Sequence, residues 1–114
     1  MFKNFVFSAA TIFLIATPAF ADPITANWKR PNGIIVKFAP CGTAFCATAV
    51  TGPHAGGSAG KLSPNGKGGY AGTLTDLENG KTYNGKGSIS GTTLTVSGCI
   101  LGGLLCRSEN WNKQ

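Results

Sequence analysis

The stretch KTYNGKGSISGTTLTVSG, residues 81–98, alternates apolar or glycine positions with polar ones on both sides of Ser90-Gly91. Side chains of a β-strand point alternately to its two faces, so this alternation predicts two half-buried strands joined by a tight turn. Treating Ser90-Gly91 as a two-residue turn places Gly87 opposite Leu94. One face of the hairpin is then largely apolar and the other is polar. Because a glycine opposite a large side chain leaves room for it, we also expect a curved and crowded interior.

Directly after this hairpin, Cys99 and Cys106 lie symmetrically about a Gly-Gly pair in GCILGGLLCRSENW, residues 98–111. A two-residue turn at that pair sets the two cysteines opposite each other. Directly opposed residues of antiparallel strands have Cα atoms about 4.5 to 5.5 Å apart, which a disulfide accepts. We therefore predict a Cys99–Cys106 disulfide.

The other two cysteines, Cys41 and Cys46, flank a second turn in PCGTAFC, residues 40–46. Four cysteines allow three pairings, and the turn favours the local pair Cys41–Cys46. Neither spacing is C-x-x-C, and the single histidine, His54, is distant from both pairs. A redox motif and a zinc site are therefore not expected.

Short strands separated by turns recur along most of the chain, and no stretch has helical periodicity. Apolar or alternating runs lie at 27–30, 33–38, 45–50 and 72–83. About seven or eight short antiparallel strands predict an all-β fold, a small barrel or sandwich stapled by disulfides. With strands this short, we expect side chains to fill the interior.

The segment TGPHAGGSAGKLSPNGKGG, residues 51–69, is rich in glycine, serine and proline. This composition predicts a long loop or a poorly ordered excursion within the domain. Within it, GGSAG (56–60) matches G-x-S-x-G. A nucleophile elbow requires a strand before the serine and a helix after it, and neither is expected here.

The chain begins with MFKNFVFSAATIFLIATPAFA, residues 1–21, which combines Lys3, an apolar run and a small-residue A-x-A end. These features are typical of a secretory signal peptide, with cleavage expected between Ala21 and Asp22. We therefore expect residues 22–114 to form a single all-β domain, periplasmic or secreted, with no membrane span after cleavage. Disulfides persist in such oxidising compartments.

The formal net charge of the chain is +6, and the basic residues are scattered along it. Such a distribution suits a solubilising surface or attraction to an anionic envelope surface. A nucleic-acid partner is not expected, since no basic run is interleaved with aromatics. The acids form no obvious catalytic pair, so we expect no catalytic, cofactor-binding or metal-binding residues and no enzymatic activity.

Three stretches carry a family resemblance: DPITANWKRPNG (22–33), CGTAFC (41–46) and the long run from DLENGKTY to RSENW (76–111). Together they resemble the DUF2147 family of exported bacterial proteins, most specifically in the carboxyl-terminal part. The resemblance implies an exported all-β protein and no defined activity. A more distant similarity to the calycin pattern implies that Trp28 stacks against Arg107.

Two classes of function remain open at this point. The first is a non-enzymatic exported barrel with a binding or structural role at an anionic envelope surface. The alternative is an inhibitor or accessory subunit that contacts a periplasmic protein through the 51–69 loop. A carrier of a small apolar ligand is less expected, because it requires a cavity.

Overall fold

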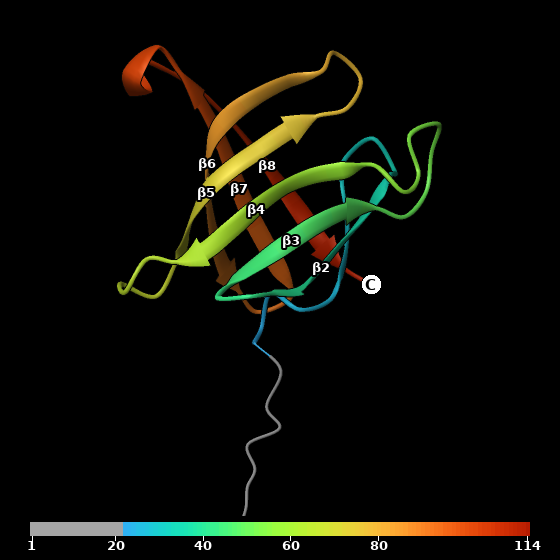
Figure 1. Cartoon of the computed structure of the whole chain (residues 1–114). Helices are drawn as coiled ribbons and strands as arrows, with labels where there is room; N and C mark the ends of the chain where they lie inside the picture. Colours follow the sequence, from blue (N-terminus) through green and yellow to red (C-terminus); the bar gives the residue numbers. More distant parts are fainter. Residues whose placement is uncertain (1–21) are drawn as a thin grey trace, which may run out of the picture.

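The computed structural model describes residues 22–114. The expected signal peptide and its cleavage residue Ala21 lie outside the described residues. Within 22–114, eight antiparallel strands form a closed barrel in which neighbours in sequence pair and β1 also pairs with β8 (Figure 1). The strands are β1 (Asn27–Lys29), β2 (Ile35–Cys41), β3 (Ala44–Ala49), β4 (Ser58–Pro64), β5 (Tyr70–Asp76), β6 (Lys81–Ser90), β7 (Thr93–Ile100) and β8 (Leu105–Lys113), with a short turn η2 (Leu101–Gly103).

The all-β prediction is therefore confirmed, and of the two expected architectures the barrel is the one that forms. No helix among the described residues is long and apolar enough to cross a membrane.

Large side chains fill one end of the barrel. Trp28, Phe38, Leu62 and Leu94 are fully buried there, together with Ile24 from the segment that precedes β1. The Trp28 indole N–H donates a 2.9 Å hydrogen bond to the Ile24 carbonyl, which satisfies the one polar atom of that ring. This cluster closes the end of the barrel where the chain enters β1.

Both predicted disulfides are present. Cys99 and Cys106 are directly opposed on β7 and β8, with Cα atoms 4.1 Å apart. Cys41 and Cys46 are joined across the β2–β3 turn, with a Cα separation of 5.8 Å. Here the bond runs diagonally, because Ala44 is the residue opposite Cys41.

The β6–β7 register differs from the prediction by two residues. The turn is Gly91-Thr92, and Ile89 pairs with Leu94 while Gly87 pairs with Val96. A two-residue slip leaves every side chain on its predicted face, so the polar and apolar pattern cannot distinguish the two registers. Gly91 has φ +61°, which glycine adopts without the penalty that a Cβ brings.

The prediction of a long loop at 51–69 is wrong, because strand β4 occupies the centre of this segment. β4 pairs with β3 on one side and β5 on the other. Its two inward side chains, Ala59 and Leu62, are three positions apart, since the register with β3 shifts at this point. A bulge inserts one extra residue and breaks the two-residue period, which is why alternation did not reveal this strand.

Candidate functional site

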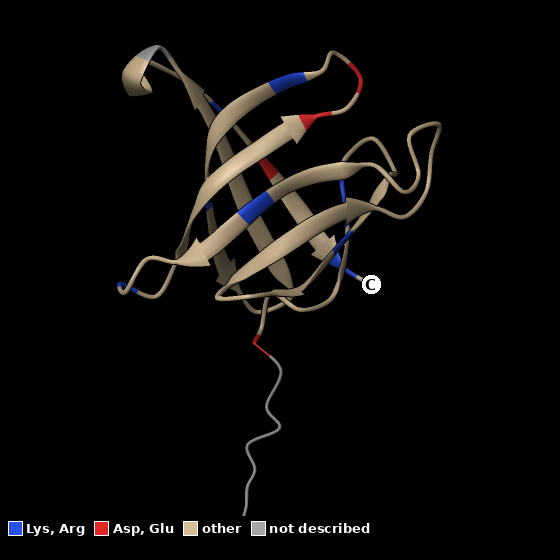
Figure 2. Cartoon of the chain, in the orientation of Figure 1, with Lys and Arg blue, Asp and Glu red and all other residues tan. Residues whose placement is uncertain are grey.

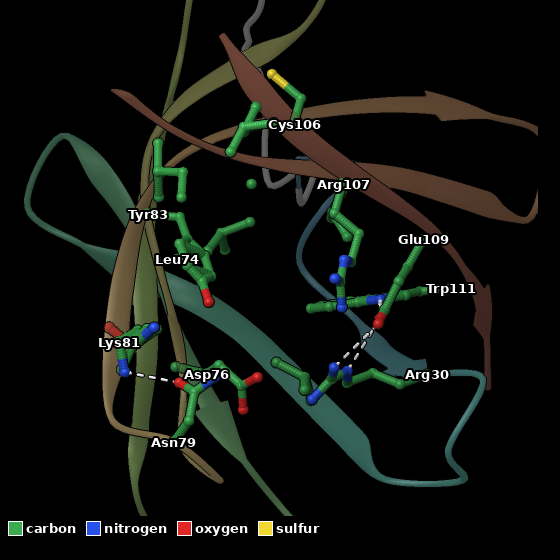
Figure 3. A pocket seen from close by; sticks show the side chains of 17 residues that line it. Arg30, Leu74, Asp76, Asn79, Lys81, Tyr83, Cys106, Arg107, Glu109 and Trp111 are labelled. Atoms are coloured by element: carbon green, nitrogen blue, oxygen red, sulfur yellow. Dashed lines mark hydrogen bonds and ion pairs between the residues drawn. The ribbon is translucent and has the colours of Figure 1, made fainter. Parts of the chain in front are cut away.

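A cavity of about 490 Å³ lies inside the barrel next to the filled core, and the core residues Val36, Ala59, Val96 and Trp111 also line it. Figure 3 shows the side chains around it. The cavity lies beneath the turns that join β1 to β2, β5 to β6 and β7 to β8. The expectation of a filled interior is therefore wrong. Small-molecule sites in proteins usually measure about 300 to 1,000 Å³, so this volume suits one small ligand.

Three glycines face one another across adjacent strands beside the cavity, and Gly98 is the one that lines it. Gly72 of β5 pairs with Gly85 of β6, which pairs with Gly98 of β7. Neighbouring side chains lean over this glycine row: a Cβ at Gly85 would lie 2.6 Å from Leu74 Cγ, and one at Gly98 would lie 3.1 Å from the Tyr83 ring. Because these glycines carry no side chains, the row makes room for Leu74 and Tyr83, which form the cavity wall in its place.

Strand β8 supplies the opposite wall. Its alternate residues Leu105, Arg107, Glu109 and Trp111 all line the cavity, as the two-residue period of a strand requires. Two charged side chains therefore lie on the inner face of the barrel, between a leucine and a tryptophan. Figure 3 shows Arg107 and Glu109 extending from β8 toward Trp111.

Glu109 is held by three hydrogen bonds. Arg30, which follows β1, donates to both carboxylate oxygens, from Nε at 3.1 Å and from Nη2 at 3.2 Å. The Trp111 indole N–H donates at 2.8 Å, and the Arg30 guanidinium also lies 5.6 Å from the centre of the Trp111 ring. The cluster joins residues that are 79 positions apart in the chain.

These contacts determine the charge state of Glu109. Partial burial by itself raises the pKa of this carboxyl, but the hydrogen bonds from Arg30 and Trp111 and the charges of Arg30 and Arg107 outweigh it. The pKa of Glu109 is held below its ordinary value of 4.5. Glu109 is therefore a carboxylate at neutral pH and neutralises Arg30.

Arg107 differs from Arg30 in having no such partner. Among residues 22–114 its guanidinium makes neither a hydrogen bond nor an ion pair. The Lys81 ammonium group, at the β5–β6 end of the cavity, likewise makes no hydrogen bond or ion pair within the described part of the chain. Only its backbone N–H is bonded, to the Asn79 side-chain oxygen. The Asp76 carboxylate accepts a 2.9 Å hydrogen bond from the Glu78 backbone N–H in the turn that follows β5.

The rest of the lining combines an apolar part with a polar one, which includes Thr75 and Asn79. Leu74 and Tyr83 lie across the cavity from Arg107 (Figure 3). Ile100 and Leu105 stand at the mouth on the disulfide-bonded β7–β8 hairpin and are exposed, as is Leu104 at its tip.

The structure corrects the expected stack of Trp28 with Arg107. Trp28 is fully buried in the filled core, whereas Arg107 is exposed to the cavity. The cation–π contact found in the described residues joins Arg30 to Trp111 instead. Position along β8 explains the difference: Trp28 lies beside Lys113 at the end of this strand, whereas Arg107 is near its start.

The sequence led us to expect Tyr83 and Trp111 in the core and assigned no functional role to either of them, nor to Arg30 or Glu109. One signal was present in LCRSENWNK, where every second residue of a strand faces the same side. Arg107 and Glu109 therefore share a face with Leu105 and Trp111. Charged residues on the inner parity of a barrel strand indicate a polar interior site.

The other motifs do not assemble a site in the described residues. Ser58 of the G-x-S-x-G match begins strand β4, so no helix follows it as an elbow requires. His, Cys, Asp and Glu side chains form no cluster suited to a metal ion within 22–114. Asp22, the residue after the expected cleavage point, accepts a hydrogen bond from the Tyr70 hydroxyl.

Comparison with known proteins gives one family match. A family model described as an uncharacterized protein conserved in bacteria (DUF2147) matches residues 57–113, which include β4 to β8 and therefore the glycine row and the charged β8 wall. No curated protein and no solved structure matches the chain.

Proposed function

We propose that this chain, which belongs to the DUF2147 family, is an exported, non-enzymatic protein that binds a small molecule inside its barrel. The cavity carries this proposal. It measures about 490 Å³, opens at one end and combines apolar walls with a few charged groups, a combination typical of ligand sites.

Two features support export. The chain begins with a segment typical of a secretory signal peptide, and all four cysteines form disulfides, which are maintained in oxidising compartments. We expect the protein to work in the periplasm or outside the cell.

The two functions that the sequence favoured, binding to an anionic envelope surface and contact with a partner enzyme, have less support than the binding of a ligand in the cavity. Basic residues are distributed over separate strands and turns (Figure 2), with no single cationic face in that view for an anionic envelope surface. The centre of the segment expected to contact a partner enzyme is strand β4, whose backbone already pairs on both sides, and only its two ends, 51–57 and 65–69, lie outside that strand. A cavity ligand therefore replaces both as the proposed binding function.

A pair of leucine variants tests this function. Gly98→Leu places a large side chain on the cavity wall, whereas Ser97→Leu places the same side chain on the outer face of the same strand, where Ser97 contacts Ser108. The full chain would be expressed in a bacterial host, recovered from the periplasmic fraction and analysed by native mass spectrometry.

We expect the wild type and Ser97→Leu to carry a small molecule, or to bind one from a soluble envelope extract, and Gly98→Leu to carry none while remaining folded. A measured protein mass equal to that of residues 22–114 would support cleavage before Asp22 and therefore export. Equal occupancy of both variants would contradict the cavity as the site, and recovery only from the cytoplasm would contradict export.

A further inference from the structure

We infer that the cavity ligand is a small amphipathic anion, in which an apolar body carries one oxyanion group, a carboxylate or a phosphate, that binds Arg107. This inference rests on the proposed function and adds the chemical class of the ligand and the residue that selects it.

The charges of the cavity lining favour an anion. Arg30, Lys81 and Arg107 are cationic, and only Asp76 and Glu109 are anionic. Glu109 already neutralises Arg30 through a two-point hydrogen bond, and Asp76 lies directly opposite Lys81 on the paired strands β5 and β6. The one excess positive charge therefore remains with Arg107, which would repel a cationic ligand.

The position of Arg107 makes it the anchor. Its side chain extends from the middle of the β8 wall into the cavity (Figure 3), and within 22–114 its donors have no partner. A guanidinium presents a planar fork of N–H donors that matches the two oxygens of a carboxylate or phosphate. The Arg30–Glu109–Trp111 cluster beneath it is already internally satisfied, so it supports the site without competing for the ligand.

One part of the remaining wall suits an apolar body, while Thr75, Asp76, Asn79 and Lys81 form a polar part. Leu74, Val96, Ile100 and Leu105 line the cavity with aliphatic surface, and Tyr83 and Trp111 add ring faces. A wholly apolar ligand would cover Arg107 without offering it a hydrogen-bond acceptor, which carries a desolvation penalty. An amphipathic anion would place its apolar body against the aliphatic side chains and its oxyanion group on Arg107.

Four decyl probes with different head groups test this inference: decanoate, decyl phosphate, 1-decanol and decylammonium. Trp111 lines the cavity and Trp28 lies in the filled core, so a change in tryptophan fluorescence that is absent in Trp111→Phe reports binding in the cavity. We expect decanoate, decyl phosphate or both to bind at least about tenfold more tightly than 1-decanol, with decylammonium weakest. The ratio of the two anions distinguishes a carboxylate site from a phosphate site.

Arg107 variants then locate the anchor. Arg107→Gln should reduce anion affinity at least about tenfold, equivalent to 1.4 kcal/mol, and leave 1-decanol unaffected. Arg107→Lys, which keeps the charge but loses the fork, should fall between them. Lys86→Gln removes a positive charge from an exposed position on β6 whose strand partner is Ser97, and it should bind like the wild type.

The outcomes separate this inference from the proposed function. Equal affinity for decanoate, decyl phosphate and 1-decanol, or unchanged anion affinity in a folded Arg107→Gln variant, would overturn the inference and leave a small-molecule site in place. If no probe binds and the periplasmic protein carries no small molecule, both fail.

Discussion

Replacing Gly72 by alanine should destabilise the barrel more than any other glycine-to-alanine change within the glycine row. Gly72 lies on β5 opposite Leu62 of β4 and Gly85 of β6. A Cβ added there would overlap the Lys61 carbonyl oxygen and lie 3.1 Å from Leu62 Cα. Both obstacles are backbone atoms of β4, so the clash is relieved only if the two strands separate.

The geometry sets the expected magnitude. Overpacked sites cost about 1 to 3 kcal/mol when neighbouring side chains adjust. At Gly72 a paired strand must move, so we expect the upper end, about 3 kcal/mol. For a domain of this size each kcal/mol lowers the melting temperature by about 4 to 8 °C, which predicts a fall of roughly 12 to 24 °C.

Gly87→Ala is the matched control. Gly87 lies on the neighbouring strand β6, and a Cβ there would meet only side-chain atoms, Leu62 Cδ1 at 3.3 Å and Leu94 Cδ1 at 3.4 Å. Because flexible ends can shift and alanine restricts the unfolded chain, we expect a change within about 1 kcal/mol. Urea unfolding followed by tryptophan fluorescence measures both variants. Equal midpoints for Gly72→Ala and wild type, or a larger loss in Gly87→Ala, would refute the reasoning.

Three further perturbations test the Arg30–Glu109–Trp111 cluster, the Cys99–Cys106 disulfide and the filled core. Glu109→Gln should lower the free energy of unfolding by about 1 to 2 kcal/mol at pH 7, because Arg30 loses its ion-pair partner in a partly buried position. Since the folded pKa of Glu109 lies below 4.5, this contribution is fully present above pH 4.5 and lost as pH falls through the folded pKa; an unfolding difference that persists well into acid would contradict this assignment. Replacing Cys99 and Cys106 together by serine should cost roughly 2 kcal/mol by the loop-entropy estimate, seen as a lower urea midpoint, and no shift would mean that the hairpin forms equally well without the bond. Leu62→Ala should cost about 2 to 5 kcal/mol because Leu62 is fully buried, and calorimetry that shows less than about 1 kcal/mol would place it outside the core.

Features with a local cause could be predicted from the sequence. Both disulfides followed from cysteines that flank short turns, and the faces of β6 and β7 followed from the two-residue period of a strand. The position of the β6–β7 turn did not follow, because a slip of two residues preserves both faces. Strand β4 was missed because the bulge near Gly60 sets Ala59 and Leu62 out of phase.

The candidate site depends on pairing between distant strands. Arg30 and Glu109 lie 79 residues apart and meet only because β1 pairs with β8 to close the barrel. The inner parity of β8 could have revealed Arg107 and Glu109 as cavity residues, but it names neither the partner of Glu109 nor the open space before them.

By itself, the sequence determined the strand-rich fold, the alternating faces and the local disulfides, because each depends on spacings of a few residues. The tertiary structure alone decided that the barrel is open at one end. Gly72, Gly85 and Gly98 are separate glycines in the chain, and they form one side-chain-free row only when the registers of β5, β6 and β7 align them. The packing of Leu74 and Tyr83 over this row, and with it the cavity wall that they form, is a consequence of register between strands, a long-range property that no local pattern carries.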